Sequence, residues 1–147
     1  MAGMHETVRA GRTPVQTIAI VISAVFLLVG VLGFIPGVTT EFDSMTFAGH
    51  DSGALLLGVF AVSILHNIVH LLYGVVGLLL ARTASGAVAF LVGGGVIYLG
   101  LWVYGLLIDQ ETTANFVPVN TADNWLHLVL GAVMVGLGLI FGTRRRS

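Results

Sequence analysis

The chain has no cysteine and no lysine, and charged residues make up only 9% of its 147 amino acids. Without cysteine, disulfide bonds, thiolate metal ligands and cysteine nucleophiles are all excluded. A soluble domain carries about 25% charged residues, so this composition argues against a soluble globular protein. The formal net charge is −1, and no basic patch lies away from the chain ends. Nothing in the sequence therefore indicates a nucleic-acid partner.

Long apolar runs are what the sequence does have, since 56% of its residues are hydrophobic. A helix needs roughly 20 apolar residues to cross the core of a bilayer. Four such runs are present, each ended by turn residues or charge. They predict an all-α, multi-pass membrane protein: a single domain, 1–147, with a bundle of four transmembrane helices at about 15–35, 53–81, 86–108 and 123–142. The second run is longer than a bilayer requires, so we expect it to tilt or to project from the membrane.

The arginines all fall on one side of a four-span chain. Arg9 and Arg12 precede the first span, Arg82 lies between the second and third, and residues 144–146 follow the fourth. Positive charge gathers in the cytoplasmic loops of membrane proteins. We therefore predict that both termini are cytoplasmic, the N-in and C-in arrangement.

A short pattern occurs twice. The segment "HNIVHLLYG", which begins at His66, aligns with "DNWLHLVLG", which begins at Asp123, and the two share N-x-x-H-L-x-x-G. Both copies lie in spans that run from outside to inside. They indicate two helix hairpins related by an axis along the membrane normal, which is an internal parallel repeat. The first and third spans match only loosely, so the indication comes from the second and fourth.

Four segments, "GRTPVQ", "FAGHDSGALLLG", "HNIVHLLYG" and "NFVPVNTADNWLHLVLG", together resemble a bacterial four-span family known as domain of unknown function 4383. The resemblance extends over roughly residues 11–142. It implies a compact four-helix membrane domain in a bacterial plasma membrane. It implies no activity, because none is established for that family, so a function has to be sought in the residues themselves.

Polar side chains recur inside the second and fourth runs. A charge in mid-membrane costs about 2.5–3.5 kcal/mol on insertion scales, and even a neutral histidine needs partners for its ring nitrogens. On each helix these side chains share one face, at intervals of three or four residues. We predict that they face the interior of the bundle and form a polar cluster in its outer half: Asp51, His66, Asn67, His70, Asp123, Asn124 and His127.

The leading interpretation of this cluster is structural and requires no cofactor. Asp123 lies four residues before His127 on the same helix face, where it can accept the ring proton. Asn67 and Asn124 can each cap facing side chains across the two parallel helices. Such interhelical hydrogen bonds contribute about 0.6 kcal/mol each, so they would specify which helices pair more than they would add stability.

A metal site is one alternative. His66 and His70 have the i, i+4 spacing at which two imidazoles can share an ion, and His127 with Asp51 or Asp123 can complete the coordination shell. A zinc protease is excluded, because Asn67 stands where the motif H-E-x-x-H needs its glutamate base.

A haem site is a second alternative, with His70 and His127 as axial ligands and Gly74 and Gly131 making room for the porphyrin.

A proton or solute pathway is the third alternative. It would be lined by Asp51, His66, His70 and Asp123, with histidine changing its charge near neutral pH. A serine nucleophile is not expected, because no serine lies in the G-x-S-x-G context; catalysis of another kind stays open, although the sequence leans against it. We expect the lipid bilayer to surround the protein. A second copy of the chain or another membrane protein is a possible partner, which the sequence does not identify.

Overall fold

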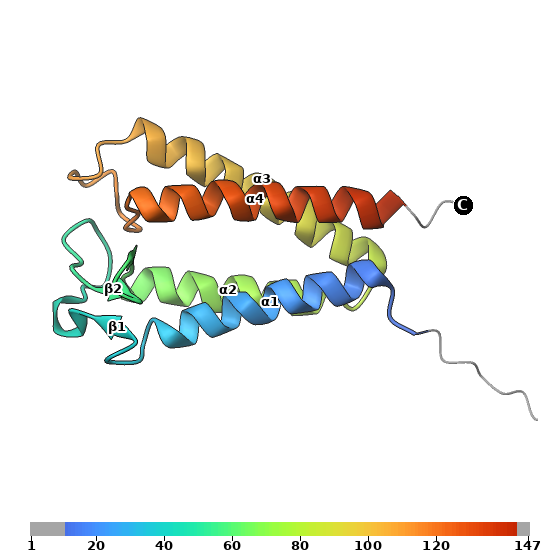
Figure 1. Ribbon diagram of the computed structural model, residues 1–147, viewed down its shortest axis with the longest axis horizontal. Coiled ribbons are helices and arrows are strands. Elements are labelled where there is room, and N and C mark those ends of the chain that lie inside the picture. The colour runs from blue at the N-terminus through green and yellow to red at the C-terminus, as the bar shows by residue number, and fades with distance from the viewer. Residues whose placement is uncertain (1–10, 144–147) are drawn as a thin grey trace, which may run out of the picture.

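The computed structural model describes residues 11–143. Four α-helices dominate this part of the chain: α1 (Pro14–Leu32), α2 (Ile64–Leu80), α3 (Ala84–Leu107) and α4 (Thr121–Thr143). They lie side by side with alternating direction, as Figure 1 shows. Helix α1 packs chiefly along α2, and α3 packs chiefly along α4, so the bundle consists of two helix hairpins. The prediction of four helices is confirmed, and the described part of the chain is mostly helical.

Three of these helices are long and apolar enough to cross a bilayer: α1 with 19 residues, α3 with 24 and α4 with 23. Their outward faces expose large apolar side chains; Val21 is 57% exposed and Val129 is 58% exposed. Helices that are apolar on their outer faces as well as their inner ones are typical of membrane spans. The chain therefore has the helices of a membrane protein. Helix α2 is also apolar, but it has 17 residues.

The prediction of one span over 53–81 is wrong in its first part, because α2 begins at Ile64. Ser63 is its N-cap, and the Ser63 Oγ accepts a hydrogen bond from the backbone N–H of His66 at 3.1 Å. Before it, Leu57 and Gly58 take positive φ angles of 54° and 70°. A chain that turns through the left-handed region cannot continue a right-handed helix there.

Residues 53–63 fold instead as part of a small antiparallel sheet. Strands β2 (Leu55–Leu56) and β3 (Phe60–Ala61) form a hairpin, and β2 also pairs with β1 (Thr39–Thr40). A short 3₁₀ helix (Phe42–Ser44) lies between β1 and β2 in the chain. The apolar side chains of this segment pack over the end of α1, where Val62 is fully buried. The run is long because it covers the bundle, not because a helix tilts or projects.

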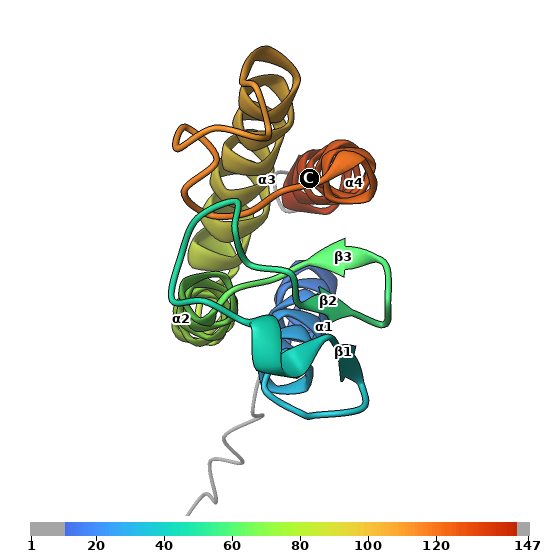
Figure 2. The same cartoon turned by 90° about the vertical axis from the view of Figure 1, so that its left-hand side faces the viewer.

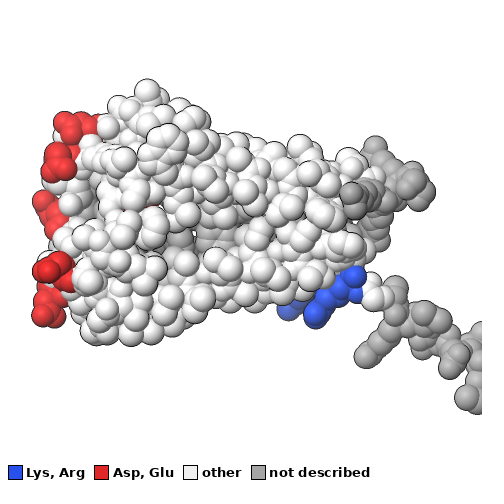
Figure 3. Space-filling view, in the orientation of Figure 1, with Lys and Arg blue, Asp and Glu red and all other residues white. Residues whose placement is uncertain are grey.

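The sheet and the α3–α4 connection gather at one end of the bundle, which we call the loop end (Figures 1 and 2). The α2–α3 turn and the beginning of α1 lie at the other end. Figure 3 shows that charge is divided in the same way, with acidic side chains at the loop end and arginines opposite. Arg12 and Arg82 are exposed there, while Arg9 and residues 144–146 lie outside the described residues.

Candidate functional site

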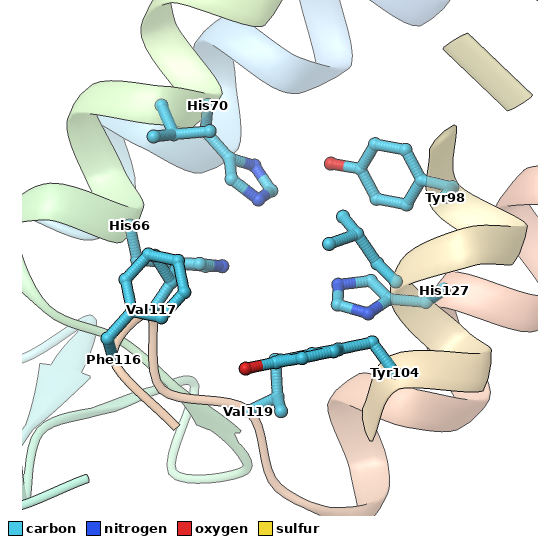
Figure 4. A pocket seen from close by; sticks show the side chains of 10 residues that line it. His66, His70, Tyr98, Tyr104, Phe116, Val117, Val119 and His127 are labelled. Carbon is cyan, nitrogen blue, oxygen red and sulfur yellow. The ribbon is translucent and has the colours of Figure 1, made fainter. Parts of the chain in front are cut away.

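Three histidines line one cavity near the loop end. His66 and His70 lie on the first two turns of α2, and His127 lies on the second turn of α4. The cavity has a volume of about 140 Å³. Figure 4 shows His66 and His70 on one side of it, facing His127 on the other. The remaining lining is apolar or aromatic: Val69, Tyr98, Leu101, Tyr104, Phe116, Val117 and Val119.

The three imidazoles are buried, with exposed fractions of 7% for His66, 8% for His70 and 6% for His127. Among the described residues, the Nδ1 atom of each ring has no hydrogen-bond partner. An unsatisfied buried polar group costs about 1–3 kcal/mol, and the great majority of buried side-chain polar atoms have a partner. All three atoms belong to side chains that line the same cavity.

Aromatic neighbours hold these rings in position. The centroids of His66 and His70 are 4.4 Å apart, and the ring of Phe26 on α1 lies 5.5 Å from that of His70. On the other side, Tyr98 of α3 meets His127 edge-on at 5.2 Å. Tilted and edge-to-face contacts at these distances are the favoured arrangements of aromatic rings. Each hairpin thus supports a cavity histidine with a ring from its own first helix.

The connection between α3 and α4 forms one wall of the cavity, and Asn115 organises it. Asn115 is 4% exposed, and its Nδ2 donates to the carbonyl oxygens of Gln110 and Val119, each at 3.0 Å. Its Oδ1 accepts the backbone N–H of Val119 at 3.0 Å. The carbonyl oxygen of Phe116 also accepts a hydrogen bond from the backbone of Gly49 at 2.7 Å. Phe116, Val117 and Val119 are thereby held against the cavity.

Sequence reasoning missed these wall residues. Tyr98, Tyr104 and Phe116 look like ordinary apolar or interfacial residues in the sequence. Asn115 alone carries a signal, because asparagine often folds a loop by bonding to nearby backbone groups. The aromatic residues enter the site only through tertiary packing.

Asp123 is buried, with 2% of its surface exposed, but it does not hold His127. Its Oδ2 accepts the backbone N–H groups of Ala61 and Asn120, both at 3.0 Å. Asn120 returns the interaction, since its Oδ1 accepts the backbone N–H of Asp123 at 3.0 Å. Asn120 therefore caps α4, and Asp123 completes the reciprocal capping box from inside the first turn. Its bond to Ala61 also ties α4 to β3.

The predicted contacts of the two asparagines across α2 and α4 do not appear among the hydrogen bonds of residues 11–143. The Nδ2 of Asn124 donates to the carbonyl oxygen of Gly105 on α3 at 3.0 Å. Asn67 packs against Gly33, at the end of α1, and its Nδ2 lies 3.9 Å from the Sδ of Met45. Each asparagine therefore joins the two helices of its own hairpin.

Asp51 lies outside the cluster in which it was predicted. Its side chain is 83% exposed, and its Oδ1 is 3.3 Å from the Nε2 of His50. The neighbouring Ser52 turns inward instead, and its Oγ donates to the carbonyl oxygen of Val62 at 2.6 Å. Asp51 therefore lies at the surface and does not line the cavity. With Asp51 at the surface and Asp123 engaged in the capping box, the interpretation as a pathway lacks both of its carboxylates.

A metal centre is not supported by this arrangement. Within residues 11–143 no group of three or more His, Cys, Asp or Glu side chains is placed to hold a metal ion. The imidazoles of His66, His70 and His127 share a cavity without forming a ligand set.

A haem does not fit either. Gly74 lies against Leu27 of α1, and Gly131 lies against Leu99 of α3, so neither glycine leaves room for a porphyrin. A cavity of about 150 Å³ admits a single benzene ring, whereas a porphyrin has four pyrrole rings.

The family model described as "Domain of unknown function (DUF4383)" matches residues 16–140. The matched segment includes most of every helix, the connections at the loop end and all residues that line the cavity. Comparisons with curated proteins and with solved structures give no match.

Proposed function

The chain belongs to the DUF4383 family, a domain of unknown function, and we propose that it is a membrane protein that binds a small molecule in the cavity lined by His66, His70 and His127. The observation that carries this proposal is the convergence of three buried imidazoles on one cavity of about 140 Å³. Their Nδ1 atoms have no partner among residues 11–143. Asn67 and Asn124 also have an Oδ1 without a partner among these residues, but neither lines the cavity, so the meeting of the three histidines at one cavity sets them apart.

The shape and chemistry of the cavity suit this role. Ligand sites are usually concave and mostly apolar, with a few polar groups that converge on the ligand. Here the polar groups are imidazoles supported by Phe26 and Tyr98, so little rearrangement is needed to bind. The volume corresponds to one six-membered ring. The ligand, or the part of it that enters, is therefore small.

A structural role is the second candidate, for Asp123, Asn124 and Asn67 only. Asp123 joins β3 to α4, and Asn124 joins α4 to α3. These contacts position the two hairpins around the cavity. They support a division of the predicted cluster into residues that fix helices and residues that meet a ligand.

We further propose that α2 crosses the bilayer as well. The chain then spans a bacterial plasma membrane four times, and both of its termini lie in the cytoplasm. At a rise of 1.5 Å per residue, its 17 residues extend roughly 26 Å, at the short end of the usual range for a span. The charge division in Figure 3 supports this orientation, because Arg12 and Arg82 lie at the end opposite the acidic loops.

The two hairpins also support an internal repeat. Equivalent residues of α2 and α4 make equivalent contacts with α1 and α3, and a constant offset of 72 residues relates the contacted positions on α1 and α3. A site between parallel repeats is a common arrangement in membrane transporters. The matching contacts are Phe26–His70 with Tyr98–His127, Gly33–Asn67 with Gly105–Asn124, and Leu27–Gly74 with Leu99–Gly131.

Phenol, one ring with one hydroxyl, provides the test of ligand binding. The purified protein in detergent is heated with and without phenol, and the same is done for Leu101→Trp, which places a bulky ring in the cavity. Leu106→Trp is the matched control, because Leu106 is 60% exposed on the same helix and does not line the cavity. A ligand that binds only the folded state raises the melting temperature.

We expect phenol to raise the melting temperature of the wild type and of Leu106→Trp by a few degrees, and to leave Leu101→Trp unchanged. An equal response of all three proteins, or none in any of them, would show that the cavity does not bind.

A further inference from the structure

We propose that the ligand is the head group of a lipid-soluble 1,4-quinone or of its hydroquinone, which reaches the cavity from the bilayer between α2 and α3. This inference rests on the proposed function above and specifies the ligand class of the same cavity.

The placement of the polar groups leads to this class. His66 and His70 come from α2, while His127 comes from α4 and faces them across the cavity in Figure 4. A ligand that satisfies both sides needs hydrogen-bonding atoms at opposite edges of a small body. A six-membered ring with oxygens at positions 1 and 4 has this geometry, and one ring matches a cavity of about 140 Å³.

The type of polar group narrows the class further. Within residues 11–143, the cavity is lined by no carboxylate, guanidinium or ammonium group, so a neutral ligand is favoured over an ion. A neutral imidazole has one nitrogen that donates and one that accepts a hydrogen bond. Imidazoles can therefore donate to the carbonyl oxygens of a quinone and accept from the hydroxyls of a hydroquinone. A purely apolar ring would leave the ring nitrogens unsatisfied.

The walls favour a planar ring. Tyr98, Tyr104 and Phe116 surround the cavity together with the imidazoles, as Figure 4 shows. Aromatic side chains stack on, or meet edge-on, a flat ring placed between them. The Tyr104 hydroxyl is already engaged, because it donates to the carbonyl oxygen of Ala114 at 2.6 Å. Tyr104 is thus fixed as a wall, and hydrogen bonding to the ligand is left to the histidines and to the Tyr98 hydroxyl, which points toward His70 in Figure 4.

Access from lipid follows from where the cavity lies. Helix α3 leans away from α2 toward the loop end (Figure 1), and the cavity is lined by side chains of both helices. Val69 on α2 and Leu101 on α3 are each 41% exposed while also lining the cavity. Both are apolar, so this side suits a ligand that arrives through the hydrocarbon phase. The chain of a lipid-soluble quinone would remain in the bilayer beyond these two residues.

The test uses four probes that share a benzene ring: 1,4-hydroquinone, its 1,3-isomer resorcinol, phenol and benzene. Binding to the full-length protein is followed by ligand-observed NMR under anaerobic conditions, with 1,4-benzoquinone as a competitor of hydroquinone. The binding signal measured with Leu101→Trp is subtracted from that of each other protein, because it reports probe that is dissolved in the detergent and not bound in the cavity. The chain has no cysteine thiol and no lysine amine that 1,4-benzoquinone could alkylate.

Three proteins are compared: the wild type, His127→Phe, which keeps a ring but removes its nitrogens, and His50→Phe. His50 is a fair control because its side chain, 24% exposed, lies beside Asp51 and does not line the cavity.

We expect hydroquinone to bind the wild type and His50→Phe at least tenfold more tightly than resorcinol or phenol, and 1,4-benzoquinone to displace it. In His127→Phe we expect the affinity for hydroquinone to fall about tenfold, to the level of phenol in the wild type. The variant keeps the two histidines of α2, so one oxygen of hydroquinone can still be bound.

Hydroquinone binding no tighter than phenol or resorcinol would overturn the quinone inference, while saturable phenol binding that Leu101→Trp abolishes would leave the proposed cavity function standing. Absence of binding by all four probes would overturn both. If His127→Phe fails to fold, the order of affinities in the wild type alone still decides the inference.

Discussion

Asp123 shows how a single carboxylate can be buried at the junction of two hairpins. Burying an ionised group is costly unless its oxygens are hydrogen-bonded. The Oδ2 of Asp123 receives two backbone N–H groups, one from Ala61 in β3 and one from Asn120 before α4. The carboxylate thus satisfies donors that belong to both halves of the chain. Its role is to hold the loop end together beside the cavity.

Replacing Asp123 with alanine should therefore destabilise the protein by about 1–3 kcal/mol, because two buried N–H groups lose their acceptor. Asp123→Asn keeps one acceptor oxygen, so its loss should be smaller. The measurement is the melting temperature of the purified protein in detergent. Asp43→Ala is the control, since Asp43 is exposed in the 3₁₀ helix, and we expect no change there. A melting temperature for Asp123→Ala equal to that of the control would contradict this account.

Helix pairing within each hairpin depends on close approach at a glycine. On α3, Gly105 lies against the side chain of Asn124, whose Nδ2 donates to the Gly105 carbonyl oxygen at 3.0 Å. A methyl group at Gly105 would occupy the place of the Asn124 amide. Small residues let transmembrane helices come close, and polar side chains then bond across the contact. The pair fixes α3 and α4 near the cavity.

Gly105→Ala should lower stability by about 1–3 kcal/mol, as is typical of overpacking at a tight contact. Gly100→Ala offers a matched control on the same helix, because a Cβ at Gly100 would meet nothing within 4 Å. Alanine has the higher helix propensity, by up to about 1 kcal/mol, so the control should be neutral or slightly more stable. Thermal unfolding of both variants in one detergent decides the matter; equal shifts would show that the Asn124 contact does not hold the hairpin.

The number of helices could be predicted from the sequence, whereas the start of α2 could not. Apolar content locates the helices because each is apolar on most of its surface. The same content fails for residues 53–63, whose apolar side chains pack on the end of α1 as short strands. The hydrophobic pattern of a short apolar run does not distinguish a strand from a helix. Gly53 and Gly58 were the available signals for a break.

The cavity shows a similar limit at the scale of the whole molecule. The expectation that polar residues avoid lipid directed attention to His66, His70 and His127, which are indeed buried. Their partners could not be read from the sequence, because Tyr98 and Phe116 reach the cavity only when α3 and the following loop fold over α2. Asp51 and the two asparagines were misplaced for the same reason. Spacing along one helix says which side chains share a face, but not which neighbour meets that face.

The charge division of the whole molecule leads to a final prediction about topology. Asp43 lies in the 3₁₀ helix that precedes α2, and Arg82 lies in the turn that follows α2. Figure 3 shows acidic side chains at the loop end and arginine at the other. If α2 crosses the bilayer, these residues lie on opposite sides of the membrane, and Glu111 lies with Asp43. The natural chain has no cysteine, so single-cysteine variants report one position each and the wild type serves as a blank.

In intact bacterial cells, a membrane-impermeant maleimide should label Asp43→Cys and Glu111→Cys but not the wild type. Arg82→Cys should react only after the membrane is permeabilised, because positive residues face the cytoplasm. Equal labelling of Asp43→Cys and Arg82→Cys in intact cells would place both ends of α2 on one side. In that case three helices would span the membrane, and the cavity would no longer lie between two membrane-embedded hairpins. Labelling of Arg82→Cys alone would instead reverse the orientation while leaving the four spans in place.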